Sequence, residues 1–235
     1  NKWWPADIHV IGKDINRFHT VYWPAMLLSA NLALPKTILV HSFINSGGQK
    51  ISKSIGNVID PFEIVSKYGL EPVRYYLLSQ VPLDTDGDFT EKRFLEVYNS
   101  DLANGLGNLV ARVAKLCETS GFKQLSSPKS VHLIDIHNDY KKAFDAYKFN
   151  DVLALIWEKI TRLDKYLNEE KPWELLKLST NHKGRELSAI LAHAADQITE
   201  IAILLEPFMP KTSDKIKNQF TKTEIKSEPA LFPRI

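Results

Sequence analysis

The first 45 residues contain two short apolar runs separated by a longer stretch with helical periodicity. Residues 8–12 form an apolar run that ends in glycine, and residues 37–43 form a second run rich in β-branched side chains. Both patterns are typical of buried strands. Residues 14–32 favour a helix, with Asp14 as its N-cap and a kink or break at Pro24. The order strand, helix, strand predicts two parallel strands whose carboxyl ends share one sheet edge, where ligands commonly bind.

Further along the chain the hydrophobic period becomes helical. Residues 61–69 and 72–79 predict two short helices, and residues 84–88 an acidic turn. From residue 90 onward, apolar residues recur three and four positions apart, as on one face of an amphipathic helix. The three longest stripes are Leu102, Leu106, Leu109, Val113 and Leu116; Leu153, Ile156, Ile160, Leu163 and Leu167; and Leu187, Leu191, Ala194, Ile198, Ile201 and Leu205. The pattern of this half therefore predicts an antiparallel helix bundle. From residue 221 it predicts a loose tail, packed by Leu231 and Phe232 if it is packed at all.

Composition narrows the class of protein. The chain has 235 residues, of which 44% are hydrophobic and 25% charged, as in a soluble protein long enough for two cores. Its formal charge is only +2, so a nucleic-acid site must be a local patch. A single cysteine, Cys117, excludes an internal disulfide, argues against a zinc knuckle and is expected to be a core thiol. We find neither a signal peptide nor an apolar run long enough to span a bilayer, and expect a cytoplasmic protein.

One loop concentrates candidate chemistry. Residues 47–57 read GGQKISKSIGN, in which Lys53 lies between two serines, Lys50 lies three residues earlier, and the run contains no carboxylate. Two glycines allow unusual backbone angles. Clustered ammonium and hydroxyl groups suit a phosphate chain whose charge grows in a transition state. Lysine and serine content alone would favour a solvated basic turn, but the length and order of the whole string argue against that reading.

Two strings in the first half resemble one enzyme family. Residues 50–54 resemble the KMSKS signature of class I aminoacyl-tRNA synthetases, with Ile51 where that family usually has Met. Residues 12–25, GKDINRFHTVYWPA, resemble the pattern G-K-D-I-x-x-F-H-x-x-x-W-P-A of methionyl-tRNA synthetases. The resemblance implies roles for particular residues: ATP binding by Gly12, Lys13, Asp14, His41, Ser52 and Lys53, methionine binding by Ile15 and His19, and catalysis by Lys50 and Lys53. From spacing alone, His19 would be read as a satisfied core histidine.

The helical half carries two further parts of the resemblance. Asn108 and Arg112 lie one turn apart on a predicted helix, and Trp173 follows a Lys-Pro pair that suits a helix start. Periodicity alone would place Asn108 and Arg112 on a solvated helix face and would make Trp173 a half-buried packing residue. The resemblance implies that they read the anticodon, because amides and guanidinium groups bond base edges and an indole ring stacks on a base. Gly105 and Gly107, which are costly inside a helix, predict a close approach by another element.

The resemblance extends over essentially the whole chain and implies its organisation. The fold class is α/β plus all-α. Residues 1–60 correspond to the C-terminal half of a Rossmann-type catalytic domain with a KMSKS-like loop, and residues 61–89 to a small stem-contact module. Residues 90–220 correspond to a helical anticodon-binding domain and residues 221–235 to a C-terminal tail.

The implied activity is that of a methionine-tRNA ligase, which joins methionine to AMP with ATP and then transfers it to tRNA(Met) with a CAU anticodon. The expected cofactors are ATP and Mg²⁺. No metal ligand set is assigned in this chain, and any zinc would belong to an N-terminal part. Lys53, assisted by Lys50, would stabilise the charge that develops on pyrophosphate, and its loss is expected to cost roughly 10²–10³-fold in rate.

The HIGH signature that class I synthetases also require is absent from the sequence. We therefore expect a fragment that does not activate methionine by itself. Two alternatives stay open: a non-catalytic tRNA-binding module, and one half of a split synthetase whose N-terminal half acts in cis or in trans. A P-loop kinase is disfavoured because the glycines and lysine do not have the spacing G-x-x-x-x-G-K-[ST]. No membrane partner is expected.

Overall fold

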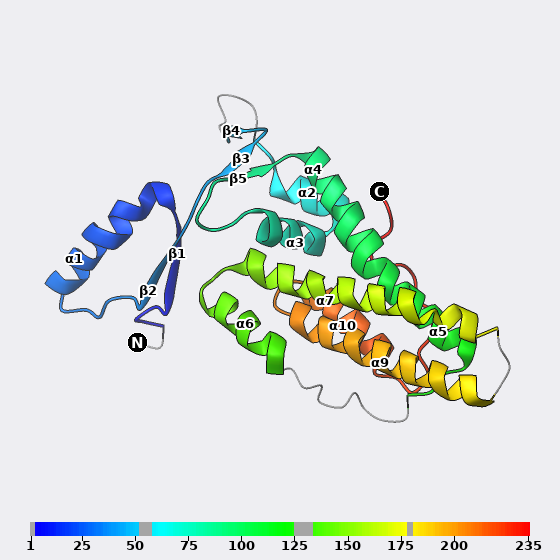
Figure 1. Ribbon diagram of the computed structural model, residues 1–235. Helices are drawn as coiled ribbons and strands as arrows, with labels where there is room; N and C mark the ends of the chain where they lie inside the picture. The colour runs from blue at the N-terminus through cyan, green and yellow to red at the C-terminus, as the bar shows by residue number, and fades with distance from the viewer. Residues whose placement is uncertain (1–2, 52–57, 125–133, 178–180) are drawn as a thin grey trace. The chain divides into compact units, whose positions relative to one another are not determined.

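The computed structural model describes residues 3–51, 58–124, 134–177 and 181–235, which fall into two compact units (Figure 1). Unit 1 comprises Asn1–Asp60 and Gln80–Thr90, and unit 2 comprises Pro61–Ser79 and Glu91–Ile235. Helices account for most of the described chain, and the strands form two small sheets.

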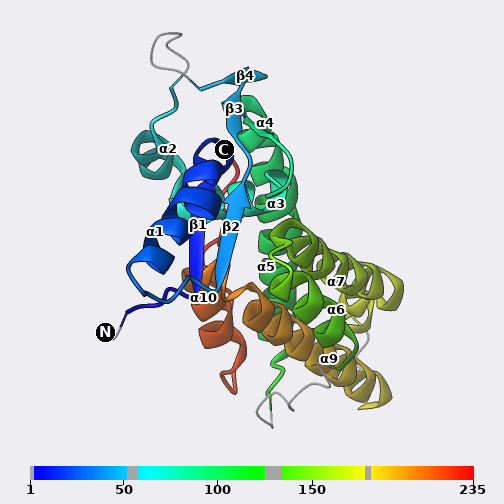
Figure 2. The same cartoon turned by 90° about the vertical axis from the view of Figure 1, so that its left-hand side faces the viewer.

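Two parallel strands organise unit 1. Strands β1 (Ile8–Gly12) and β2 (Thr37–His41) pair in parallel from Ile8 opposite Thr37 to Gly12 opposite His41, and they lie side by side in Figure 2. The connection between them consists of η1 (Lys13–Ile15), η2 (Phe18–Tyr22) and α1 (Trp23–Ser29). Pro24 lies in the first turn of α1, where the missing N–H costs nothing. The two predicted strands are thus confirmed. The two segments expected around Pro24 correspond to a change from π to α turns at Trp23, and the helical backbone is not broken there.

The expectation that β1 is a buried strand was only half right. Ile11 is buried, whereas Ile8 and Val10 are exposed, Val10 by 65%. Successive side chains of a strand point to opposite faces of the sheet. One face of β1 is therefore covered, and the other is left open by the part of the chain that the structure describes.

A second sheet in unit 1 was not predicted. It has the strand order β4 (Gln49–Lys50), β3 (Ile44–Ser46), β5 (Gly87–Phe89), with β3 antiparallel to β4 and parallel to β5. Gly47 and Gly48, with φ of 62° and 75°, form the tight turn between β3 and β4. Residues 84–88 are consequently not only an acidic turn, because β5 begins at Gly87. Strands of two or three residues are too short for an alternating pattern to reveal.

Unit 2 is helical, and its helices lie where the periodicity predicts them. The apolar stripes are buried against one another, with α9 beside α5, α7 and α10 (Figure 1). Gly69, with φ of 88°, ends α2 as expected of a C-cap glycine. The elements are α2 (Pro61–Tyr68), α3 (Leu70–Gln80), α4 (Glu91–Val97), η3 (Tyr98–Gly107), α5 (Asn108–Ser120), α6 (Ile134–Asp145), α7 (Phe149–Glu170), α8 (Pro172–Leu175), α9 (Asn181–Leu205) and α10 (Pro210–Phe220).

The C-terminal tail is packed rather than loose, and Phe232, one of the two residues expected to pack it, is buried. Ile225 is buried as well. Tyr98 donates a hydrogen bond to the Pro233 carbonyl oxygen at 2.9 Å, and the Asn99 side chain bonds both the N–H and the carbonyl oxygen of Ile235. The tail sequence lacks periodicity because side chains of η3, rather than a regular element of its own, hold its backbone.

One helix corrects the expectation that no apolar run is long enough to span a bilayer. Gly184–Leu205, within α9, meets that criterion by length and composition. The core helix of a soluble protein has the same character, and 61% of this stretch is buried inside the structure. Its composition is therefore explained by packing within unit 2.

Candidate functional site

The carboxyl ends of β1 and β2 lie together, as predicted. Gly12 and His41 are register partners, so the Gly12–Asp14 turn and the chain leading to the lysine loop leave the same sheet edge. A Cβ atom on Gly12 would lie 2.8 Å from Asp14 Oδ1 and 3.8 Å from His41 Cε1. A side chain at position 12 would therefore require the Asp14 carboxylate to move from its present position.

Two histidines near this edge have a defined tautomer. His19 Nδ1 lies 3.1 Å from the Ile15 carbonyl oxygen, and His41 Nδ1 lies 2.9 Å from the Ser42 carbonyl oxygen. A carbonyl oxygen only accepts hydrogen bonds, so each Nδ1 carries the proton and each Nε2 of the neutral ring is an acceptor. The bond also joins His19 to Ile15, the two residues expected to line a methionine pocket.

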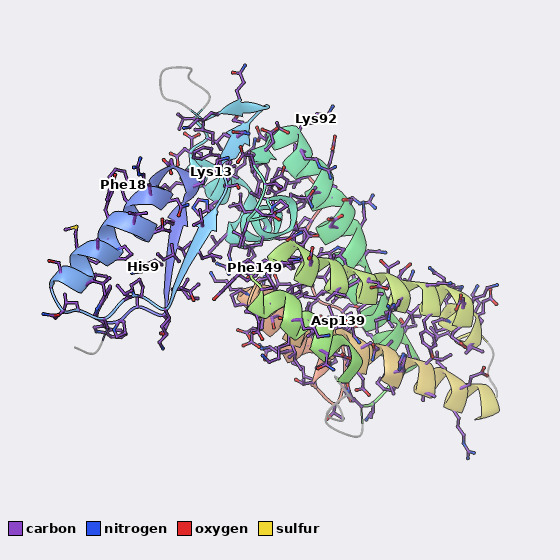
Figure 3. The ribbon with its side chains drawn as sticks, turned by 60° about the vertical axis from the view of Figure 1, so that its left-hand side comes forward. His9, Lys13, Phe18, Lys92, Asp139 and Phe149 are labelled. Atoms are coloured by element: carbon purple, nitrogen blue, oxygen red, sulfur yellow. The ribbon has the colours of Figure 1, made fainter. Side chains whose placement is uncertain are left out.

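Lys13 is held by residues that the sequence did not single out. Its Nζ atom lies 2.5 Å from Asp86 Oδ1 and 4.4 Å from the centroid of the Phe43 ring. The Lys50 Nζ atom lies 4.4 Å from the same centroid. Figure 3 shows Lys13 where β1 gives way to η1. Two of the predicted site lysines therefore meet at one aromatic ring.

Asp86, just before β5, and Asp88, within β5, anchor this region. Asp86 Oδ1 also accepts the Phe43 N–H at 2.9 Å, and Asp88 Oδ1 accepts the Gly48 N–H at 2.9 Å. Both hydrogen bonds lower the pKa of the Asp86 carboxyl, the bond from Lys13 more than the bond from the Phe43 N–H. Both aspartates lie 40 or more residues beyond their partners in sequence, so no local spacing could have indicated the pairs.

Ser52 and Lys53 lie outside the described residues. Their predicted roles, in ATP binding and, for Lys53, in catalysis, stay predictions. Lys50, at the end of β4, is the described lysine of the KMSKS-like string.

A second cluster of predicted residues lies in unit 2. Arg112 on α5 places its guanidinium 5.8 Å from the centroid of the Trp173 ring on α8. From α7, Asp164 Oδ1 lies 2.9 Å from Arg112 Nη2, and Asn168 Oδ1 accepts a bond from Nη1 at 3.3 Å. The structure thus brings Arg112 and Trp173 together, and adds Asp164 and Asn168, which the sequence reading missed.

This cluster includes one buried polar atom without a partner and lies one turn from an exposed amide. Arg112 Nε is buried without a hydrogen-bond partner, and Asn108, one turn earlier on α5, is exposed. Lys171 takes a left-handed conformation, with φ of 46°, which ends α7 and turns the chain into α8. Trp173 follows two residues later and is half-buried. A charged planar group beside an indole ring and an exposed amide is suited to a flat ligand with polar edges, such as an unstacked base.

The described residues contain no group of three or more His, Cys, Asp and Glu side chains that could hold a metal ion. Cys117 is buried, as predicted for a core thiol, and burial raises its pKa to about 12. It is therefore neither a ligand nor a nucleophile in this structure.

Comparison with known proteins covers both units. A family model described as tRNA synthetases class I (M) matches residues 1–114, and a model of the anticodon-binding domain of tRNA ligase matches residues 132–233. The methionine–tRNA ligase of Thermotoga maritima is 39% identical over 239 residues, covering 98% of this chain and 37% of the relative. The corresponding protein of Bacillus subtilis is 40% identical over 233 residues, covering 95% and 35%.

Solved structures agree with these sequence matches. The Mycobacterium tuberculosis methionyl-tRNA synthetase in complex with methionyl-adenylate has a TM-score of 0.87 and 32% identity, with coverage of 99% of this chain and 51% of that one. The chain spans little more than a third of the length of the curated relatives above. The family models, the relatives and the solved structures together show that this chain belongs to the methionyl-tRNA synthetase family of class I, of whose members it spans a part.

Proposed function

We propose that this chain is the part of a methionine–tRNA ligase that contributes ATP and methionine contacts from unit 1 and reads the CAU anticodon of tRNA(Met) with unit 2. The observation that carries the proposal is the cluster in which Asp164 and Asn168 hold the Arg112 guanidinium beside Trp173. The membership of the chain in a tRNA-ligase family supports the same assignment.

The proposal includes a division of the chain. Residues 1–60 would form the second half of a Rossmann-type fold, in keeping with the parallel β1–β2 pair. Residues 61–89 would form the stem-contact module, residues 90–220 an antiparallel anticodon-binding bundle, and residues 221–235 the tail. The proposed location is the cytoplasm, where tRNA and ATP are both available.

In the first step of the proposed reaction, the methionine carboxylate attacks the α-phosphorus of ATP, and pyrophosphate leaves. In the second step, a terminal ribose hydroxyl of the tRNA attacks the methionyl carbonyl, and AMP leaves. Gly12, Lys13, Asp14, His41 and Ser52 would bind the nucleotide. Lys53 and Lys50 would stabilise the charge that develops on the leaving pyrophosphate.

Mg²⁺ would accompany the nucleotide rather than occupy a site built by this chain. Magnesium usually binds substrate phosphates together with one or two carboxylates, and the described residues supply no larger ligand cluster. The chain's own contribution would be to contact ATP through Lys13 and to stabilise the leaving pyrophosphate through Lys53 and Lys50.

The test is binding of this chain to methionine tRNA and to the same tRNA with an altered anticodon, at one fixed salt concentration. We expect the alteration to weaken binding, and Trp173→Ala to remove most of the difference. Stacking on one base is worth about 1–3 kcal/mol, or roughly 5- to 150-fold in affinity.

The matched control is Trp3→Ala, which removes an 80% exposed indole from unit 1. It should leave discrimination between the two tRNAs unchanged. Equal binding of both tRNAs by the unaltered chain would contradict anticodon reading and leave only charge-driven affinity. Anticodon discrimination would not separate a ligase fragment from a non-catalytic tRNA-binding module or from one half of a split synthetase. A second chain that restores methionine activation would favour the split synthetase.

A further inference from the structure

We propose that Asp86 is a positioning residue of the nucleotide site: it holds the Lys13 ammonium at the carboxyl edge of β1 and β2, beside Phe43 and Lys50. This inference rests on the proposed function. None of the family's sequence motifs given above includes Asp86, and Asp86 acts through Lys13 rather than on the nucleotide itself.

The first argument is that one oxygen atom joins two separate parts of unit 1. Asp86 Oδ1 accepts a bond from Lys13 Nζ at 2.5 Å and from the Phe43 N–H at 2.9 Å. Lys13 begins the turn after β1, and Phe43 lies just after β2. The Asp86 carboxylate therefore connects the ends of both parallel strands.

The second argument is that the backbone around Asp86 is fixed. The Gly87 N–H donates to the Phe43 carbonyl oxygen at 2.9 Å, and the Ser42 N–H donates to the Leu83 carbonyl oxygen at 2.9 Å. A Cβ atom on Gly87 would lie 2.5 Å from Val81 Cγ1, so the turn before β5 closes too tightly for any other residue. The position of Asp86 is thus determined by the fold and not by a freely moving loop.

The third argument is that folding stability does not account for this ion pair. The Lys13 and Asp86 side chains are 40% and 39% exposed, and pairs this exposed contribute little to stability. The pair does determine where the ammonium lies: 4.4 Å from the Phe43 centroid, the same distance as the Lys50 ammonium. The Phe43 ring is thus contacted by ammonium groups from two segments of unit 1, and ammonium groups of this kind bind the negative charge of a polyphosphate.

The experiment is ATP–pyrophosphate exchange by the complete protein that contains this chain, with Asp86→Asn as the test variant. Asparagine keeps an acceptor for the Phe43 N–H and removes only the charge that holds Lys13. We expect kcat/KM for ATP to fall about 10- to 100-fold, as for a misplaced site group, and KM for methionine to change less than about twofold. Thermal unfolding of Asp86→Asn should remain close to that of the unaltered protein, because the pair is exposed.

A double-variant cycle separates positioning from a general structural effect. If Asp86 acts through Lys13, then Asp86→Asn should add nothing to the loss caused by Lys13→Met. The matched control is Asp7→Asn, since Asp7 forms an ion pair with Lys36 at 2.6 Å beside the amino ends of the same two strands. It should leave kcat/KM for ATP unchanged.

The outcomes distinguish the two proposals. If the complete protein shows no exchange, the proposed function is wrong, and the inference that rests on it is wrong as well. If the protein is active and Asp86→Asn behaves like Asp7→Asn, the inference alone is overturned. Full additivity of Asp86→Asn and Lys13→Met would also overturn it, because it would show that Asp86 does not act through Lys13.

Discussion

The surroundings of Cys117 suppress the reactivity of its thiol. The thiol is fully buried on α5, and burial raises its pKa from 9.0 to about 12. The folded protein favours the neutral thiol. The contribution of Cys117 to folding stability is therefore fully present below pH 9 and is lost as the pH rises toward 12, because the unfolded chain loses the thiol proton first.

We predict that Cys117 reacts with iodoacetamide at pH 8 only when unit 2 opens. The thiolate is the reactive form, and the folded environment suppresses it. Alkylation followed by mass spectrometry should be slow in buffer and fast in urea above the unfolding midpoint. Rapid alkylation without urea, at the rate of a free thiol, would contradict the buried position.

The residues of the candidate sites were easier to predict from sequence than the residues that contact them. Lys13, Arg112 and Trp173 could be identified because each lies in a string whose spacing carries information. Asp86 and Asp164 could not, because they contact those residues from 73 and 52 positions away along the chain. Which carboxylate reaches which cation is decided by the packing of whole elements, and nothing local encodes it.

Among the elements, η3 explains the two glycines that looked costly in a helix. It has π-helical turns over Tyr98–Gly107, directly before α5. A Cβ atom on Gly107 would lie 2.9 Å from the Leu102 carbonyl oxygen, and one on Gly105 would lie 3.4 Å from the Ser100 carbonyl oxygen. The close approach predicted from sequence is therefore made largely by the helix's own backbone five residues earlier.

We predict that Gly107→Ala destabilises unit 2 by about 1–3 kcal/mol, because the obstructing atom belongs to the backbone and cannot move aside cheaply. The matched control is Gly184→Ala in α9, where a Cβ atom would meet nothing within 4 Å. That substitution should stabilise by up to about 1 kcal/mol through helix propensity. Urea unfolding monitored by circular dichroism compares the two variants. If Gly107→Ala is as stabilising as Gly184→Ala, the geometry assigned to η3 is wrong.

Helices and strands were predicted correctly where the segment was long enough to show a clear hydrophobic pattern. The long helices of unit 2 were found because several periods of hydrophobicity fit within each of them, and β1 and β2 were found because each is a continuous apolar run. Strands β3, β4 and β5 have three residues or fewer. β3 pairs with β4 across a two-residue turn, but its pairing with β5 joins segments more than 40 residues apart. The hydrogen bonds of the tail could not be predicted for a related reason, since side chains such as Asn99 bond its backbone directly.

At the scale of the whole molecule, the two units differ in how much apolar surface they bury. Among the described residues, unit 1 has three buried apolar side chains, Ile11, Leu27 and Phe89. Unit 2 contains the remainder of the core, including the stripes of α5, α7 and α9. Several large apolar side chains of unit 1 are exposed instead: Val10, Phe18, Val21, Met26, Leu28 and Leu32. Figure 3 marks Phe18 on the η2 segment.

We predict that the two units of this chain do not unfold together. Burial of apolar surface is the main favourable contribution to folding, and it must exceed the entropy lost by each ordered residue. Unit 1 has little such burial, so β1, β2 and β3 should open at a low free energy, while α5, α7 and α9 should open only near the global unfolding free energy. Hydrogen exchange followed by mass spectrometry measures this directly, with peptides from β1–β2 exchanging in native buffer long before peptides from α7 and α9. Equal protection of both sets, together with a single coincident urea transition, would show that the chain folds as one cooperative body and that unit 1 gains stability from contacts beyond its own core.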